Sequence, residues 1–282
     1  MNRRKFLQIG GVGLLTVAGG SLFTNFSGID RSDFTDEKYG DISLSKELID
    51  IFYHASLAPS GHNTQPWLIK LIDRNRFRIS LNNNCLLPAV DPNNRESLLS
   101  IGAFTENLVL SANKYGYATE LKMLTENPYS EDIMEVKLSG DRAIPFQMQK
   151  IINRRTVRNG YSTREIKAED FAYITNNDTN HFHYFTNESK EGRYMSQGTI
   201  EANRIQAFRD DAQEELANWI RWSPEEAKNK RDGLTPESME IEGFAGWVVR
   251  NFYSAQTAKE TSFREKTVEK VVEHVNSSGG WI

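Results

Sequence analysis

Apolar and polar positions follow two different periods in the first half of the chain. A helical spacing runs from Ser45, a good N-cap residue, to about Leu57 and predicts a helix. Alternation then runs through Trp67–Asp73 and Phe77–Leu81 on either side of Arg74-Asn75, which predicts a β-hairpin. The pattern therefore leaves a polar elbow, residues 58–66, between a helix and a strand.

The next apolar stretch is longer. Residues from Asn94 to about Tyr115 are apolar on more than one side, which predicts a long and largely buried helix. Gly102 and Ala103 within it would allow close packing. Thr119–Leu124 and Met134–Leu138 have the composition of strands, and we expect them to complete an antiparallel sheet with the hairpin.

The second half is more polar, and its pattern predicts a helix from about Thr163 to Ile174, a strand over His181–Phe185 and a long charged helix over Glu191–Trp222. The polar segment Ser223–Glu242 contains Gly and Pro. It is interpreted either as a mobile flap or as a plain surface loop. Strands and helices together predict the α+β class.

The N-terminus has the features of a targeting segment. Asn2-Arg3-Arg4-Lys5-Phe6-Leu7 precedes a glycine-rich apolar run from Ile9 to about Phe23, and together they resemble a twin-arginine export signal. An ordinary secretory signal or anchor is the alternative. No clean Ala-x-Ala site follows, so cleavage and retention as a membrane tether both stay open. We expect residues 1–27 to be this signal and residues 28–43 to be an acidic linker.

Composition limits the classes of function. The chain has 282 residues, enough for two units of roughly 120 residues each. Its net charge of -4 gives no basic surface for nucleic acid. Cys85 is the one cysteine, which excludes an internal disulfide and a multi-cysteine metal centre, and we interpret it as a packed residue.

The polar elbow is the first candidate site, and together with Trp67, which begins the strand after it, its sequence is Ala58-Pro59-Ser60-Gly61-His62-Asn63-Thr64-Gln65-Pro66-Trp67. Pro59 ends the preceding helix, and the small polar residues after it expose backbone amides and short side chains. Such groups match the carbonyl oxygens and nitrogens of a flat heteroaromatic ring. The alternative is a polar turn in which Ser60 or Asn63 caps a neighbouring element.

A basic cluster, Arg154-Arg155-Thr156-Val157-Arg158, follows the apolar stretch Phe146–Ile152 and is the second candidate site. Arginine forks with a hydroxyl suit a phosphomonoester. The alternative is a solvated helix terminus, and Arg155 is the residue that fits this alternative best.

These two segments resemble the signatures of the FMN-dependent nitroreductase family, namely its Pro-Ser-x-x-Asn-x-Gln-Pro-Trp loop and its Arg-x-Ser-x-Arg/Lys corner, with Thr in place of Ser here. The resemblance implies FMN contacts from both segments. Arg154 and Thr156 would hold the phosphate and ribityl chain, and Arg158 would face N1 and the C2 carbonyl. For His62, donation to the O4 or N5 region and a mere spacing role stay open. The implied cofactor-binding residues are Pro59, Ser60, Gly61, His62, Asn63, Arg154, Arg155, Thr156 and Arg158.

The order of the two signatures is the reverse of that in ordinary members, which are homodimers. The resemblance therefore implies a two-lobed branch in which one chain forms a monomeric pseudo-dimer. Each lobe, residues 44–142 and residues 143–282, would have an antiparallel sheet flanked by helices, with one flavin between them. The ending Gly279-Gly280-Trp281-Ile282 is typical of the start of a strand, so we expect the sequence to be a fragment of a longer chain.

The function that this resemblance implies is an FMN-dependent NAD(P)H oxidoreductase. Hydride would pass from NAD(P)H to flavin N5 and on to a nitroaromatic, quinone or similar acceptor, so no side chain need be catalytic. A flavin-sequestering protein is the main alternative, and a protein without cofactor is a third. His181 and His183 lack the further ligands that a metal pair needs, and no metal is expected. The signal implies export through the twin-arginine translocase to the periplasm or the outer face of the cytoplasmic membrane.

Overall fold

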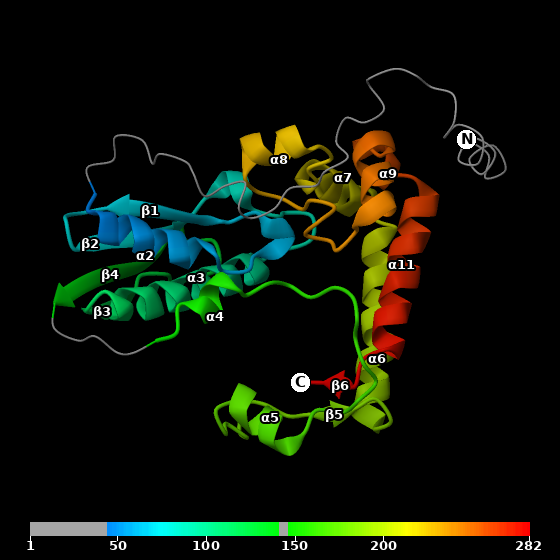
Figure 1. The fold of residues 1–282 in the computed structure, drawn as a ribbon, viewed down its shortest axis with the longest axis horizontal. Helices are drawn as coiled ribbons and strands as arrows, with labels where there is room; N and C mark the ends of the chain where they lie inside the picture. Colours follow the sequence, from blue (N-terminus) through cyan, green and yellow to red (C-terminus); the bar gives the residue numbers. More distant parts are fainter. Residues whose placement is uncertain (1–43, 141–145) are drawn as a thin grey trace.

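The computed structural model of the protein describes residues 44–140 and 146–282, and it is an α+β structure with an antiparallel sheet and many helices (Figure 1). The predictions for the signal, residues 1–27, and for the linker, residues 28–43, lie outside the described residues. So does the boundary predicted between the two lobes at residues 142 and 143.

The described elements alternate between short strands and helices of very different lengths. In chain order they are α2 (Lys46–Ser56), η3 (Gly61–Asn63), β1 (Trp67–Leu71), β2 (Arg76–Leu81), η4 (Asn83–Cys85), α3 (Arg95–Lys114), β3 (Tyr117–Met123), β4 (Asp132–Gly140), α4 (Gln149–Ile152), α5 (Ala168–Ile174), β5 (Phe185–Thr186), α6 (Lys190–Ala207), α7 (Asp210–Trp219), α8 (Pro224–Lys230), α9 (Gly243–Phe252), α10 (Ala255–Ala258), α11 (Thr261–Asn276) and β6 (Gly280–Trp281).

The main sheet forms from the first half of the chain. Its strand order is β1-β2-β4-β3, and every neighbouring pair is antiparallel. The core unites this sheet with α2 and α3, because Phe77 and Ile79 of β2 are buried with Ile51 of α2 and with Phe104 and Leu108 of α3. Burial of such side chains contributes roughly 1.5 to 3 kcal/mol each before entropy is counted.

Most predicted elements of this half are confirmed. The Ser45 hydroxyl accepts a hydrogen bond from the Leu48 amide at 3.3 Å and starts α2. The hairpin pairs Trp67 with Leu81 in register, and the Trp67 ring stacks on Phe104 with centroids 4.9 Å apart. Trp67 therefore anchors β1 directly behind the polar elbow.

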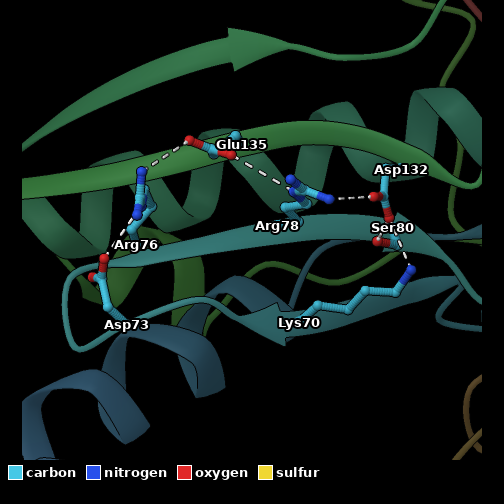
Figure 2. A network of polar contacts seen from close by, with 7 residues as sticks. All are labelled: Lys70, Asp73, Arg76, Arg78, Ser80, Asp132 and Glu135. Carbon is cyan, nitrogen blue, oxygen red and sulfur yellow. Dashed lines mark hydrogen bonds and ion pairs between the residues drawn. The ribbon is translucent and has the colours of Figure 1, made fainter.

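The outward face of the sheet is a chain of charged side chains (Figure 2). Asp132 accepts hydrogen bonds from Lys70 at 2.8 Å, from Arg78 at 3.0 Å and from the fully buried Ser80 hydroxyl at 2.6 Å. These contacts, led by the hydrogen bond from Lys70, lower the pKa of Asp132 to about 2. The sequence alternation of β2 therefore separates an apolar face from an ion-paired one.

The second half of the described chain is mainly helical. Helices α6 and α11 lie side by side, and the short strands β5 and β6 pair antiparallel beside α6 (Figure 1). This pair is the sheet that the described part of the second half contains, and each of its strands has two residues. A pseudo-dimer of two equivalent lobes therefore remains a prediction, whereas the strand expected at the final Gly279–Ile282 segment does form.

The prediction of one long helix over Glu191–Trp222 is wrong. The chain leaves helical geometry at Arg209, which has φ -85° and ψ 125°, and α7 begins there in a new direction. The reason is tertiary: the half-buried backbone amides of Ala89 and Val90 donate to the two carboxylate oxygens of Glu215 at 2.9 and 3.1 Å. The turn at Arg209 brings this carboxylate of α7 onto the first half of the chain.

Two further boundaries differ from prediction. His181 lies in a turn instead of a strand, because Asp178 accepts hydrogen bonds from the His181 amide at 3.2 Å and pairs with its ring at 2.8 Å. The strand is limited to Phe185–Thr186. Helix α5 begins at Ala168 and not near Thr163.

The charged face of the sheet gives the first prediction. Because the native pKa of Asp132 is depressed, its contribution to stability is full above the unfolded value of 3.8 and is lost as the pH falls through about 2. Asp132→Asn should reduce the free energy of unfolding by about 1 kcal/mol at neutral pH, allowing for solvent screening, and much less in acid. Urea unfolding across this pH range measures both.

Asp73→Asn is the matched control, since Asp73 pairs with Arg76 in the exposed hairpin turn. A loss of equal size in both variants, or a loss that does not diminish in acid, would contradict this account of Asp132.

Candidate functional site

The polar elbow folds into a tight loop built on η3. Three of the four residues from His62 to Gln65 have a positive φ although none is glycine, namely His62 at 46°, Asn63 at 54° and Gln65 at 53°. The Gln65 amide donates to the Ser60 hydroxyl at 3.0 Å, which closes the loop on itself. Residues held in this region cost free energy and cluster at functional sites.

A later segment of the chain holds this loop from outside. The Asn63 side-chain amide donates to the Gly233 carbonyl at 3.0 Å, and the Gly233 amide donates to the Asn63 carbonyl at 3.0 Å. Gln65 donates to the Arg231 carbonyl at 2.7 Å. Ser60 and Asn63 therefore help to shape the loop, as the alternative interpretation of a polar turn expected.

Gly233 is required for this contact. Its φ of 76° favours glycine, and a Cβ built there would lie 2.4 Å from the Trp219 carbonyl oxygen. Below it, the buried Arg221 guanidinium forms an ion pair with Asp232 at 2.7 Å and lies over the Trp219 ring at 5.4 Å. The segment 219–234 is thus a rigid support for the loop, and the part of the predicted flap that it covers is fixed to the molecule.

The basic cluster comes to the same place. Arg154 donates through Nε to the carbonyl of Leu57 at 3.1 Å, and Leu57 ends α2 two residues before Pro59. Arg158 donates through Nε to the Ser238 carbonyl at 3.2 Å, and its own amide donates to the Glu240 carboxylate at 3.0 Å. The two arginines are four positions apart in the chain, so at most about 14 Å lies between their backbones.

Two imidazole groups flank Arg158. His62 is partly buried, and burial followed by the nearby charge of Arg158 lowers its pKa. His274, from α11, is hydrogen-bonded to the backbone of Arg158, and burial is again the largest cause of its lowered pKa. One ring nitrogen of each, Nδ1 of His62 and Nε2 of His274, is buried without a hydrogen-bond partner. Most buried polar atoms in proteins are hydrogen-bonded, so two unpartnered imidazole nitrogens close to Arg158 are unusual.

A carboxylate lies directly on the loop. A Cβ built at Gly61 would meet the Glu96 carboxyl carbon at 2.7 Å, so only glycine leaves space for Glu96 in this position. Partial burial and then the charge of Asp91 raise the pKa of Glu96. Glu96 also lines an open cavity of about 540 Å³ at the start of α3, together with Val90, Asp91, Pro92, Asn93, Arg95 and Leu99.

The structure therefore brings Pro59, Ser60, Gly61, His62 and Asn63 together with Arg154 and Arg158. Arg155 and Thr156 are exposed on the surface beside them. Sequence reasoning did not single out Gly233, Ser238, Glu240 or His274, although the first three lie in the segment Ser223–Glu242 that it interpreted as a possible flap over the site. The turn-like pair Asp232-Gly233 was the local signal for Gly233.

Among the described residues, neither the cysteine nor any group of possible metal ligands forms a second candidate site. Cys85 is partly buried, and burial and then the charge of Asp232 raise the pKa of its thiol. Within residues 44–140 and 146–282, no group of three or more His, Cys, Asp or Glu side chains is placed to hold a metal ion. In the same ranges, no helix has both the length and the apolar character to cross a bilayer.

Comparison with known proteins gives little further information. No family model and no curated protein matches the chain. Among solved structures, a nitroreductase-like protein from Streptococcus mutans is a weak neighbour, with 17% sequence identity and a TM-score of 0.28. The match covers 38% of this chain and 85% of that one. A match this weak does not establish the fold family or the activity of this chain.

The support beneath the loop gives the second prediction. Gly233→Ala should lower the free energy of unfolding by about 3 kcal/mol or more, because it adds a backbone clash to the strain of a positive φ. Gly116→Ala is the matched control: Gly116 has φ 86° but no atom near its Cβ position, so only strain of about 1 kcal/mol is expected. Urea unfolding measures both.

Limited proteolysis adds a local readout. Gly233→Ala should expose residues 58–66 to cleavage under conditions in which Gly116→Ala does not. Equal stability losses with equal cleavage rates would show that the contact between Gly233 and Asn63 does not hold the loop.

Proposed function

We propose that the protein is an FMN-dependent oxidoreductase of the nitroreductase type. One observation carries the proposal. Arg154 contacts the residue that leads into the Pro59–Asn63 loop although the two partners are 97 positions apart in the chain. The two segments that resemble the family's flavin-binding signatures are therefore neighbours in space, as a composite site between an earlier and a later part of the chain requires.

The side chains present suit this cofactor. The guanidinium of Arg154 and the exposed hydroxyl of Thr156 can both donate hydrogen bonds to a phosphomonoester. Arg155 lies on the solvent side of them. Arg158 is a fixed cation, held through Nε and through its backbone, at the end of the cluster that faces His62. The buried Nδ1 of His62 needs a hydrogen-bond partner that the described protein does not supply, and a ring edge would provide one.

Bound FMN would supply the redox chemistry, with NAD(P)H as electron donor and a nitroaromatic, a quinone or a similar compound as acceptor. The residues of the chain would bind the cofactor, orient it and shield it from water. Arg158 would stabilise negative charge at its end of the site, and the loop, braced by Gly233, would fix the position of His62. No side chain is assigned as a nucleophile.

The cavity at the start of α3 is the best candidate for the acceptor. It adjoins Gly61 through Glu96, and its apolar wall consists of Val90, Pro92 and Leu99. A volume of about 540 Å³ is in the range of small-molecule sites. Burial and the charge of Asp91 raise the pKa of Glu96, and its carboxyl at the cavity is the group that we propose as proton donor when a quinone or nitro group is reduced.

Flavin sequestration is the second candidate function, and a specific contact favours it. The segment around Arg231 and Gly233 is hydrogen-bonded to the loop at Asn63 and Gln65. A segment fixed to the loop in this way would limit the opening of the loop, and so would restrict the entry of a second substrate and retain the cofactor. Access to the ring therefore distinguishes an enzyme from a storage protein.

The location and assembly that we propose rest on the sequence. The twin-arginine resemblance of residues 1–27 favours export by the twin-arginine translocase to the periplasm or the outer face of the cytoplasmic membrane, with a tether if the signal is retained. That route carries folded cargo, which suits a protein that loads its cofactor first. A monomer with two pseudo-dimeric lobes is the assembly that the reversed order of the signatures implies.

The third prediction tests cofactor binding. Protein purified without added cofactor should be yellow and should release FMN in acid. Arg154→Ala should weaken FMN binding at least about tenfold, because a charge-assisted contact with the phosphate is lost. Arg154→Lys keeps the positive charge but not the two-pronged guanidinium, so it should weaken FMN binding less than Arg154→Ala does. Quenching of FMN fluorescence on titration measures the dissociation constants.

Arg74→Ala, in the exposed hairpin turn, is the control and should bind like the wild type. Melting temperatures are compared in parallel, because Arg154 also contacts the end of α2. A colourless protein that binds no FMN would overturn the proposed function, and equal affinities in all variants would remove Arg154 from the site.

The fourth prediction separates the two functions. Mixing the yellow protein with NADPH under argon should bleach the flavin absorption within seconds to minutes if the protein is a reductase. Subsequent addition of a quinone should restore the colour. Persistent yellow colour with NADPH, but bleaching with dithionite, would instead support sequestration.

A further inference from the structure

We propose that His62, through Nδ1, takes up one proton when a flavin on this loop is reduced, and that Arg158 sets the pH range in which it does so. This inference rests on the proposed function. It concerns the regulation of the same site, because it makes the driving force for electron transfer depend on pH more steeply than the flavin alone would.

The geometry of His62 is the first argument. Its backbone is held at φ 46° in a loop that is closed through the Ser60 hydroxyl and braced by Gly233, so the position from which the ring projects is fixed. Nδ1 is buried and has no hydrogen-bond partner. One nitrogen of the ring is thus shielded from solvent with its hydrogen-bonding capacity unused, and such a nitrogen of a neutral imidazole can accept a proton.

The charges around His62 are the second argument. Arg158 is the group whose charge acts on His62 directly, and burial together with that charge favours the neutral imidazole in the resting protein. The other charged or titratable groups nearby are Glu96 on α3 beside Gly61, Asp232 in its ion pair with Arg221, and His274 of α11 at the Arg158 backbone.

The proton balance follows from these charges. Two electrons from a reductant such as dithionite, with one proton from water, leave one negative charge on the ring system. That charge offsets the repulsion between Arg158 and a protonated His62, so the pKa of His62 rises on reduction. Between the resting and the raised pKa, a second proton passes from water to Nδ1, and the imidazolium and the ring charge balance.

The fifth prediction concerns how steeply the midpoint potential of the bound flavin depends on pH. The two-electron midpoint potential of the bound flavin should fall by about 60 mV per pH unit while two protons are taken up, and by about 30 mV per unit when one is. The full-length wild type should show the steeper slope around neutral pH, and His62→Asn should show the shallower one throughout. Spectroelectrochemical titration from about pH 5 to about pH 8 measures both.

Matched variants identify the group. His274→Asn and Glu96→Gln remove the two rival proton acceptors and should retain the steeper slope. Arg158→Gln removes the repulsion in the resting protein, so its steeper region should begin at a higher pH than in the wild type. This last variant tests the proposal independently, even where His62→Asn alters the loop.

The outcomes separate the two proposals. FMN binding with equal slopes in wild type and His62→Asn, or loss of the steep slope in His274→Asn or Glu96→Gln instead, would overturn the role of His62 and leave the proposed function intact. Failure of the wild-type protein to bind FMN would overturn both.

Discussion

The reciprocal pair of hydrogen bonds between Asn63 and Gly233 is the contact on which the candidate site depends. It joins positions 170 residues apart, and one member has a conformation that disfavours any residue with a side chain. Because backbone groups make both contacts at Gly233, the contact tolerates changes of side chain around it but not a shift of the chain. The loop can therefore keep three residues at positive φ without losing its shape.

A second junction acts in the same way at the other side of the loop. Glu215 accepts from two backbone amides of the first half, and Arg209 donates to the Ala89 carbonyl at 2.8 Å. Each junction pairs a charged or backbone group with groups that would otherwise be buried without a partner, which makes separation costly. The two halves of the chain are thus joined by directional polar contacts.

Much of the first half was predictable because local patterns and tertiary packing agree there. The alternation in β2 places Phe77 and Ile79 in the core and Arg78 and Ser80 on the charged face, as the period of two requires. The second half was less predictable. Its helical pattern continues through Phe208 and Arg209, yet the chain turns there because Glu215 finds its partners near Ala89. Likewise, His274 becomes part of the candidate site only through its contact with Arg158, which lies more than one hundred positions earlier in the chain. No sequence pattern in α11 predicts this contact.

The environment of Cys85 has a consequence for the durability of the protein. A thiol becomes a nucleophile only after losing its proton, and both burial and the negative charge of Asp232 oppose that loss. The sulfur is therefore slow to be oxidised or to form mixed disulfides with other molecules. Because Cys85 is the single cysteine, a disulfide could form only with another molecule. The low reactivity of its thiol therefore protects the protein against such intermolecular cross-links in an oxidising environment.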